Sequence, residues 1–342
     1  MASGIAAGIY TTNTPEACAY VTSHSKAEVV VLEGNKQLAK YKGAKKALPH
    51  LKALVVWGEP VDAAIAKSCG LPVHSFDEFM DLGRDITDNA VDNRFATVRP
   101  GNCATLIYTS GTTGNPKAVM ISHDNITWIS KTILDIYVPM NHTDRGVSYL
   151  PLSHIAAQII DLHVAIYLGS SIYFAQPDAL KGTLTNTLKD CKPTYFFGVP
   201  RVWEKIQEKM AQLGRETTGL MKTVSTWAKS MGAEHSRLAQ FGNEGGAPCG
   251  YHLANAVVLT KIKTALGLDK CRVCFTAAAP ISVETLNYFA SLDIPVYEIF
   301  GQSECTGPHT VSAPGEWKIG YCGRPMPGML TVNVTVVLLN SS

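Results

Sequence analysis

Residues 108–120 read YTSGTTGNPKAVM, and this stretch decides how the rest of the chain is interpreted. It follows a β-branched and aromatic run and passes through hydroxyls and glycines to a lysine. Glycine lets the backbone approach an anion closely, and hydroxyls and an ammonium group donate hydrogen bonds to phosphate. The stretch therefore predicts a loop that holds a triphosphate. Its donors would be Thr109, Ser110, Thr112, Thr113 and Lys117, with Gly111 and Gly114 providing the close approach.

This loop is not a Walker A loop, which requires Gly-x4-Gly-Lys followed by Ser or Thr. Five residues beyond Gly111 stands Pro116, and Ala118 takes the place of the hydroxyl residue. A Gly/Ser/Thr-rich turn without a ligand is the alternative. The ordered string of residues 109–117 favours the phosphate loop over that alternative.

Short β-branched runs alternate with longer helical patterns along the chain, which is typical of crossover units in an α/β fold. We therefore expect a mostly parallel sheet arrangement covered by helices. The expected strands are VVVL 29–32, ALVVW 53–57, ATLIY 104–108, VSYL 147–150, SIYFA 171–175, TYFFG 194–198, CRVCFTA 271–277 and PVYEIF 295–300. The segment 201–213 predicts an amphipathic helix with Val202, Ile206, Met210 and Leu213 on its apolar face. Residues 242–250 are rich in turn formers and predict a surface loop.

Composition narrows the class of protein. The 342 residues are 46% hydrophobic and 17% charged, which describes a globular chain with more than one compact unit. The net charge of +2 is too small for the field that a nucleic-acid binder needs. Nine scattered cysteines fit reduced thiols in an intracellular protein, and the single CxxC, Cys271 and Cys274, is interpreted as strand residues rather than a zinc or redox site.

Membrane insertion is not expected from the sequence. The first residues have neither a basic region nor a long apolar core, so they do not form a signal peptide. The most apolar stretch, 163–175, is interrupted by Gly169, Ser170 and Ser171 and is shorter than the ~20 residues of a spanning helix. Any membrane contact would be peripheral.

Several motifs carry a resemblance to a known family. TSGTTGNPK at 109–117 resembles the phosphate-binding signature of the adenylate-forming superfamily, which includes acyl-CoA synthetases, luciferases and peptide-synthetase adenylation domains. YEIFGQSECTG at 297–307 resembles the later signature of that superfamily. GVPRVWEKI at 198–206, with Pro200, Arg201 and Trp203, is similar to the fatty acyl-CoA synthetase branch. Together with IAAGIYTTN at 5–13 and GRPMPG at 323–328, it points to the bubblegum-type long-chain fatty acyl-CoA synthetases.

The resemblance implies a set of site residues. Lys117, His154 and Glu304 would be catalytic, and Thr109 and Glu304 would hold Mg²⁺, a cation that prefers hard oxygen ligands. Taken alone, His154 could be a core histidine, Glu304 a surface carboxylate and TAAAPI at 276–281 a tight strand-end loop. The implied nucleotide-binding set is Thr109, Ser110, Gly111, Thr112, Thr113, Gly114, Asn115, Pro116, Lys117, Ala278, Ala279, Pro280, Tyr297, Glu298, Ile299, Phe300, Gly301, Gln302, Ser303 and Glu304.

The resemblance also implies the large N-terminal domain of the adenylate-forming fold, with parallel sheets flanked by helices. Residues 1–328 are expected to be part of that domain, incomplete at both ends and lacking the small C-terminal domain. Residues 329–342 are expected to be a divergent tail with one strand at most. The last Asp is Asp293, so the ribose-binding Asp of the family is not expected here, and Lys318 lies too early to be the family's catalytic Lys.

The chemistry implied by the resemblance has two steps. A long-chain fatty acid attacks ATP to give acyl-AMP and pyrophosphate, and coenzyme A then displaces AMP. ATP, Mg²⁺ and coenzyme A are the expected cofactors, with a cytoplasmic location and no nucleic-acid partner; peripheral association with intracellular membranes is left open. Two alternatives remain: a truncated, non-catalytic product that binds nucleotide or an acyl chain, and activation of another carboxylic acid for a carrier protein.

Overall fold

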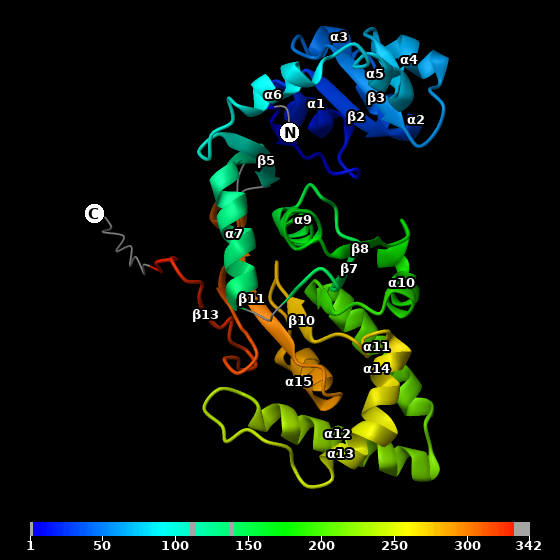
Figure 1. The fold of residues 1–342 in the computed structure, drawn as a ribbon. Helices are drawn as coiled ribbons and strands as arrows, with labels where there is room; N and C mark the ends of the chain where they lie inside the picture. Colours follow the sequence, from blue (N-terminus) through cyan, green and yellow to red (C-terminus); the bar gives the residue numbers. More distant parts are fainter. Residues whose placement is uncertain (1–2, 110–113, 137–139, 332–342) are drawn as a thin grey trace, which may run out of the picture. The chain divides into compact units, whose positions relative to one another are not determined.

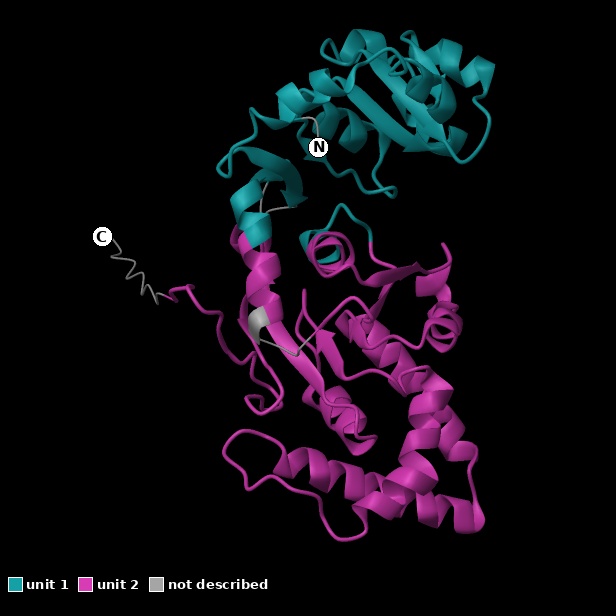
Figure 2. Cartoon of the chain, in the orientation of Figure 1, with its two compact units in different colours: residues 1–127, 151–158 teal, residues 128–150, 159–342 magenta. Residues whose placement is uncertain are grey.

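The computed structural model describes residues 3–109, 114–136 and 140–331. Within these residues the chain forms two compact units (Figures 1 and 2). Unit 1 contains residues 1–127 and 151–158, and unit 2 contains residues 128–150 and 159–342. The expected strand and tail at 332–342 lie outside the described residues, as do residues 110–113 of the phosphate loop.

Unit 1 is built on two three-stranded sheets. The first has the order β1-β5-β6, in which β1 is parallel and β6 antiparallel to β5. The second has the order β2-β3-β4 and is entirely parallel. The strands are β1 (Ala6–Ala7), β2 (Val29–Glu33), β3 (Ala53–Trp57), β4 (Val73–Ser75), β5 (Cys103–Thr109) and β6 (Lys117–Ser122).

The helices of unit 1 begin at residues suited to the N-cap. Thr14 and Asp62 accept backbone N–H groups at the starts of α1 and α4, and Ser75 and Glu78 form a capping box on α5. The helical segments are α1 (Pro15–His24), α2 (Gly34–Leu38), η1 (Ala39–Tyr41), α3 (Ala44–Ala47), α4 (Ala63–Cys69), α5 (Phe76–Asp81), α6 (Asp88–Phe95) and α8 (Ile155–Ala157). The boundary with unit 2 falls inside α7 (His123–Ile136).

Unit 2 contains a five-stranded sheet of order β13-β12-β11-β10-β9 and a parallel pair, β7 and β8. The strands β9, β10 and β11 are parallel, whereas β12 and β13 continue the sheet as antiparallel strands. The strands are β7 (Arg145–Ser148), β8 (Ser171–Phe174), β9 (Tyr195–Phe197), β10 (Val273–Thr276), β11 (Val296–Gln302), β12 (Gly307–Val311) and β13 (Arg324–Pro325).

Helices pack on the sheet of unit 2 through an aromatic core. Trp203 is fully buried and meets Phe196 and Phe289 edge to face, with ring centroids 5.3 and 4.8 Å apart. The helical segments are η2, a π-helix (Gln158–Val164), α9 (Ala165–Leu168), η3 (Ala179–Lys181), α10 (Leu184–Cys191), α11 (Pro200–Glu216), α12 (Gly219–Leu238), α13 (Tyr251–Ala254), η4, a π-helix (Asn255–Leu259), α14 (Thr260–Leu266), α15 (Val283–Ser291) and the 3-10 turn η5 (Ser303–Cys305).

All eight expected strands are confirmed, as is the α/β class with parallel sheets flanked by helices. The helix expected at 201–213 is α11, and residues 242–250 form the loop between α12 and α13. One detail is wrong: Val202 and Ile206 are buried, but Leu213 is 53% exposed. The helix continues past the core that covers its first two turns, so periodicity alone overestimates the buried face.

Candidate functional site

The β5–β6 hairpin positions both ends of the expected phosphate loop. Thr109 ends β5, Lys117 begins β6, and the two residues are directly opposite each other in the antiparallel ladder. Opposed residues in such a ladder have Cβ atoms ~5 Å apart. A hydroxyl and an exposed ammonium group therefore flank the mouth of the loop. Residues 110–113 lie outside the described residues, and Gly114 has φ 81°, a conformation that favours glycine.

Helix α1 fixes the far end of this loop. The Tyr20 hydroxyl donates to the carbonyl oxygen of Pro116 at 2.9 Å. The Tyr20 ring stacks on His24, whose Nδ1 is 2.9 Å from the Tyr108 hydroxyl at the end of β5. These contacts join residues about 90 positions apart in the sequence. Nothing in the sequence near Tyr20 pointed to this role, because the partner is a backbone carbonyl.

His154 caps the short helix α8 in unit 1. Its Nδ1 accepts the backbone N–H of Ala156 at 3.2 Å, and burial lowers the pKa of the imidazole from its usual 6.5. A neutral ring whose Nδ1 is an acceptor carries its proton on Nε2. Next to it, a Cβ at Gly8 would lie 2.7 Å from the Cα of Ser153, so the segment between β1 and α1 can approach this turn only with glycine.

In unit 2 the expected adenine segment follows β10. Strands β10 and β11 are parallel neighbours, with Thr276 opposite Glu298, so both strands end at the same edge of the sheet. Ligands of open α/β sheets bind outside the carboxyl ends of the strands. Ala278, Ala279 and Pro280 are exposed there, and Ala278 has φ 77°. A left-handed conformation at a residue with a Cβ is strained, and such strain is common at functional sites.

The second signature forms the end of β11 and the turn into β12. A Cβ at Gly301 would overlap the carbonyl oxygen of Gly307, so only glycine permits this close approach of two strands. The register shifts between Phe300 and Gly301, which bends the strand end. Glu304 lies in the 3-10 turn η5 and is exposed. Thr109 belongs to unit 1 and Glu304 to unit 2, and the structure gives the position of each residue within its own unit.

Two residues of the second signature serve the fold. Tyr297 is 5% exposed and meets Trp317 edge to face, with ring centroids 5.5 Å apart. The Oε2 of Glu298 accepts the backbone N–H of Gly320 at 2.8 Å, and burial raises the pKa of this carboxyl. A contribution of these two residues to a nucleotide site would therefore come from their backbone. The neighbouring Ile299 and Gln302 belong to β11, and Ser303 begins η5.

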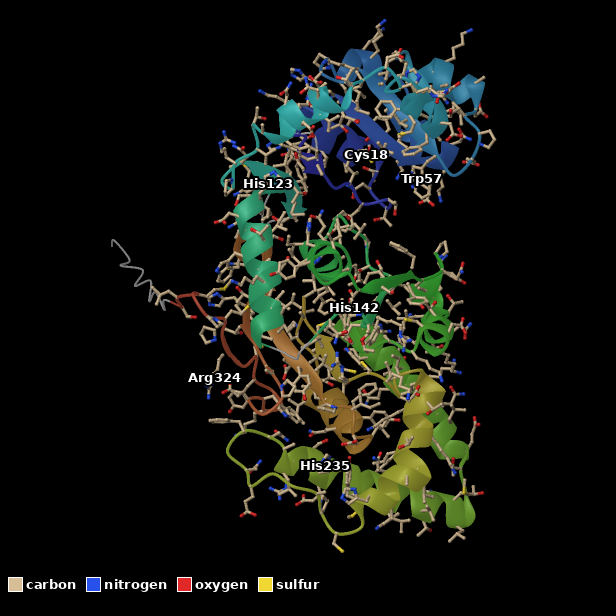
Figure 3. The ribbon with its side chains drawn as sticks, viewed as in Figure 1. Cys18, Trp57, His123, His142, His235 and Arg324 are labelled. Atoms are coloured by element: carbon tan, nitrogen blue, oxygen red, sulfur yellow. The ribbon has the colours of Figure 1, made fainter. Side chains whose placement is uncertain are left out.

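Asp293, the last Asp in the chain, is occupied by structural contacts. Its carboxylate accepts from Lys263 at 2.5 Å and from the Tyr251 hydroxyl at 2.9 Å, and lies 2.8 Å from Nδ1 of His235. These partners come from α12, α13 and α14, and His235 is labelled on α12 in Figure 3. Asp293 therefore joins three helices.

In the part of the chain that the structure describes, His, Cys, Asp and Glu side chains form no group of three able to hold a metal ion. A magnesium site would need oxygen ligands of the ATP itself as well as protein oxygens. The described helices also include none with the length and hydropathy of a membrane span.

The sequence matches the model of a protein family described as AMP-binding enzyme over residues 1–335. Among curated relatives, the long-chain-fatty-acid–CoA ligase ACSBG2 of Xenopus laevis is 47% identical over 333 residues, which cover 96% of this chain and 44% of that protein. ACSBG2 of Homo sapiens is 42% identical, with 96% and 48% covered. ACSBG1 of Mus musculus is 42% identical, with 96% and 45% covered. The chain therefore spans a little under half the length of these relatives.

Solved structures show the same fold. The anthranilate CoA ligase AuaEII in complex with anthranoyl-AMP has a TM-score of 0.62 at 18% identity, with 95% of this chain and 50% of that chain covered. The A-PCP didomain of carboxylic acid reductase from Segniliparus rugosus, in complex with AMP, has a TM-score of 0.61 at 22% identity, with 89% and 40% covered. These identities support the fold alone, whereas the family match and the curated relatives confirm the resemblance drawn from the motifs. The chain belongs to the AMP-binding enzyme family.

Proposed function

We propose that this chain serves the ATP-dependent activation of long-chain fatty acids, through acyl-AMP to acyl-CoA. The printed names of relatives that are 40–47% identical support the substrate class. The observation that carries the proposal is the β5–β6 hairpin, which sets Lys117 opposite Thr109 at the mouth of the TSGTTGNPK loop. A positioned charge there stabilises the pyrophosphate as it leaves.

The roles of the residues follow from their chemistry. Lys117 would neutralise phosphate charge, and the hydroxyl of Thr109 and the carboxylate of Glu304 offer hard oxygen ligands for Mg²⁺. The magnesium would screen the charge of the triphosphate. The nucleotide would contact Ser110, Gly111, Thr112, Thr113, Gly114, Asn115, Pro116, Ala278, Ala279, Pro280 and residues 297–304, with Tyr297 and Glu298 contributing through their backbone.

His154 would act on the acyl group as a neutral donor. Its Nδ1 is taken by the Ala156 N–H, so Nε2–H is the group left to donate. Burial keeps the ring uncharged near neutral pH because it lowers the imidazole pKa. A neutral donor can orient a carboxylate without forming an ion pair that would reduce its nucleophilicity.

Coenzyme A would be the co-substrate of the thioester step. We place the enzyme in the cytoplasm, with peripheral contact to intracellular membranes as part of the same proposal, and we treat residues 1–328 as the family domain and 329–342 as a divergent tail. A second candidate is a non-catalytic nucleotide- or acyl-binding product. It rests on the same TSGTTGNPK loop, whose donors would bind a nucleotide whether or not the thioester step follows.

Titration calorimetry with MgATP tests the phosphate loop. Replacing Lys117 with Ala should weaken binding by about 10- to 100-fold, because a charge-assisted hydrogen bond contributes ~1.5–3 kcal/mol. Lys67→Ala, on the exposed side of α4, is the matched control and should bind as the parent does. Equal affinities in the parent and Lys117→Ala, with equal melting temperatures, would contradict the assignment of the loop.

Non-hydrolysable acyl-adenylate analogues test the acyl class. Palmitoyl sulfamoyl-adenosine should bind more tightly than the acetyl analogue, because each buried methylene contributes ~0.8 kcal/mol. A benzoyl analogue separates long-chain substrates from aromatic ones. If the three analogues bound with equal affinity, the chain would recognise the nucleotide alone, and the non-catalytic binder would be the better description.

A further inference from the structure

A dense run of lysines lies in unit 1 between β2 and β3. Residues 34–58 contain six lysines and neither Asp nor Glu, although the whole chain has a net charge of only +2. No arginine occurs before Arg84. The positive charge of this segment is therefore a local feature, and the remainder of the chain carries a net negative charge.

Four lysines gather where α3 meets the end of α4 (Figure 1). The backbone N–H of Gly43 donates to the carbonyl oxygen of Ser68 at 2.9 Å, which holds the two segments together. A Cβ at Gly70 would lie 3.4 Å from the Cβ of Lys45, so the lysines of α3 start beside the end of α4. We call this cluster the lysine patch, and it consists of Lys42, Lys45, Lys46 and Lys67.

The lysine patch faces solvent and is not neutralised by the fold. Ala44 is 3% and Leu48 4% exposed, so α3 is anchored in the core of unit 1 while its lysines point outward. Lys52, nearby in the sequence, forms an ion pair with Glu28 at 2.9 Å. Among the residues that the structure describes, the four patch lysines have no such partner. The patch therefore presents four uncompensated cations.

Helix dipoles account for only part of this charge. Cations in the last turn of a helix are stabilised by its dipole, and three of the patch lysines lie in the last turns of α3 and α4. Each helix end carries about half a negative charge, so the two ends together offset about one of the four cations. The remaining charges repel one another. The patch therefore favours an anionic partner over a bare solvated surface.

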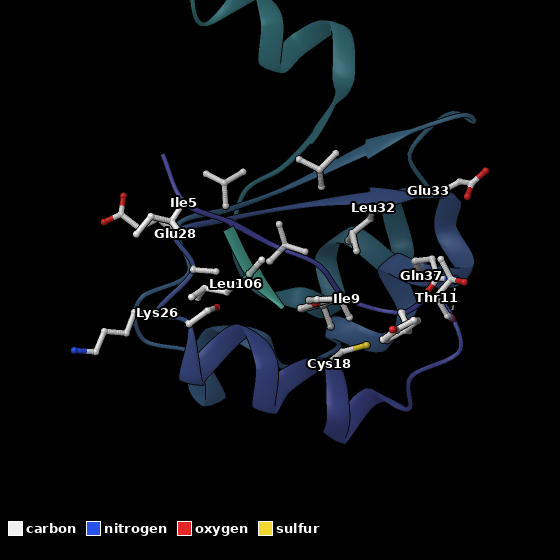
Figure 4. A pocket seen from close by; sticks show the side chains of 18 of the residues that line it. Ile5, Ile9, Thr11, Cys18, Lys26, Glu28, Leu32, Glu33, Gln37 and Leu106 are labelled. Carbon is white, nitrogen blue, oxygen red and sulfur yellow. Dashed lines mark hydrogen bonds between the residues drawn. The ribbon is translucent and has the colours of Figure 1, made fainter. Parts of the chain in front are cut away.

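The residue type and the location indicate what kind of partner this is. Arginine provides planar, two-pronged recognition of carboxylates and is enriched at protein interfaces, whereas lysine is a point charge and is depleted there. All four patch residues are lysines. A groove of about 750 Å³ in unit 1 (Figure 4) is lined by Lys26 but by none of the four. An array of point charges outside this groove suits a broad anionic surface better than a single bound anion or a peptide.

We infer that the lysine patch binds the surface of a bilayer that contains anionic lipids. Each lysine near such a surface strengthens binding about fivefold, so four together contribute about several hundredfold. The choice of a bilayer rests on the proposed function, because a long-chain fatty acid partitions into bilayers through its buried methylenes. Charge alone gives reversible binding, and the lysine patch would hold the enzyme where its substrate is dissolved.

Sedimentation of the whole 342-residue chain with lipid vesicles tests this inference. The chain should bind vesicles of phosphatidylcholine with about 30% phosphatidylserine, and it should stay in solution with phosphatidylcholine alone. Raising the salt concentration from about 0.1 M to about 0.5 M should weaken binding by about tenfold or more, because salt screens the attraction.

Replacing all four patch lysines with Gln should weaken binding to the anionic vesicles by about 20-fold or more. Replacing all four with Arg keeps the charge and should retain binding. The matched control removes the same charge from scattered exposed positions of unit 2 and should change the affinity by less than about threefold, because these charges are screened from one another. It carries Lys181→Gln, Lys189→Gln, Lys205→Gln and Lys261→Gln.

The inference would be overturned if the parent chain did not bind the anionic vesicles, if the Gln variant bound as the parent does, or if the control lost as much affinity. It would also be overturned if polyglutamate displaced the chain from vesicles at equal concentrations of negative charge, because an acidic polypeptide would then be the better partner. Titration with MgATP gives a separate result. The Gln variant should bind MgATP as the parent does, so a failure of nucleotide binding would count against the proposed function and not against the patch.

Discussion

The fold buries the side chain of Asp161, which disfavours its charged carboxylate form. It lies in the π-helix η2, beside β7 and its residue Ser148. Burial raises the pKa of the Asp161 carboxyl from its usual 3.8 to about 7, although a hydrogen bond with Ser148 acts in the opposite direction. Burial raises the pKa of Tyr149 and Tyr195 nearby, and the negative charge of Asp161 adds to the rise in both. Replacing Asp161 with Asn removes the charge and keeps the size of the side chain.

The sign and size of the effect follow from linkage. Between the unfolded and folded pKa values the folded state binds more protons, so the free energy of unfolding falls as pH rises from about 4 to about 7. A pKa difference of about three corresponds to at most ~4 kcal/mol above pH 7. Because the side chain is not fully buried, we expect a gain of ~1–3 kcal/mol for Asp161→Asn at about pH 8.

Thermal denaturation at two pH values measures this difference. A gain of that size should raise the melting temperature of unit 2 by about 2–10 °C at pH 8, and the gain should fall to less than half near pH 5. Asp190→Asn, on the exposed side of α10, is the control and should show no comparable dependence on pH. An Asp161→Asn variant that is destabilised at pH 8, or that gains equally at both pH values, would refute the reasoning.

Four further outcomes are expected. His154→Asn keeps an acceptor at the N-cap but removes the imidazole. Because burial lowers the pKa of His154, the free energy of unfolding of the parent should fall more steeply than that of the variant below about pH 6.5. Chemical denaturation at several pH values measures this difference. In a urea titration, Ala278→Gly should leave the free energy of unfolding unchanged or raise it by up to ~1 kcal/mol, because glycine relieves the strain of the left-handed backbone. The control Ala279→Gly should lower the free energy of unfolding by ~0.5–1 kcal/mol. Gly301→Ala should cost ~1–3 kcal/mol through overlap with Gly307, whereas Gly214→Ala, with nothing nearby in α11, should not destabilise. The 342-residue chain alone should make no palmitoyl-CoA from labelled palmitate, ATP, Mg²⁺ and coenzyme A, because no Asp follows Asp293 to bind ribose; synthesis at the rate of complete synthetases would contradict this.

The eight expected strands were predictable because each contains a run rich in β-branched and aromatic residues; such runs are typical of buried strands in an α/β fold, although β8 is largely exposed. Strands β1 and β4 lack such runs, with 2 and 3 residues respectively, and were missed. Strand β6 was missed for another reason: KAVMIS follows the phosphate loop, and only its antiparallel pairing with β5 defines it. Local pattern identifies a strand with a run rich in β-branched or aromatic residues, but not one that depends on its partner.

The candidate site also contains some residues that the sequence could indicate and others that it could not. Thr109 and Lys117 could be proposed from the loop motif, because glycine, hydroxyl and ammonium groups in one short segment indicate phosphate binding. The support from Tyr20 could not be predicted, since a hydrogen bond from α1 to the Pro116 carbonyl leaves no pattern in either segment. The structural use of Tyr297 and Glu298 was equally hidden, because their partners Trp317 and Gly320 follow about 20 residues later.

Backbone strain gives an independent indication of where ligands bind. Six described residues other than glycine have positive φ, and two of them, Ala278 and Thr306, follow the carboxyl ends of β10 and β11. Each such conformation costs ~1–3 kcal/mol and persists only where the surrounding structure requires it. Asp293, a third, is explained by its bonds to Lys263 and Tyr251. Ala278 is exposed and its methyl side chain forms no such bond, so its strain supports the proposed nucleotide contact at this turn.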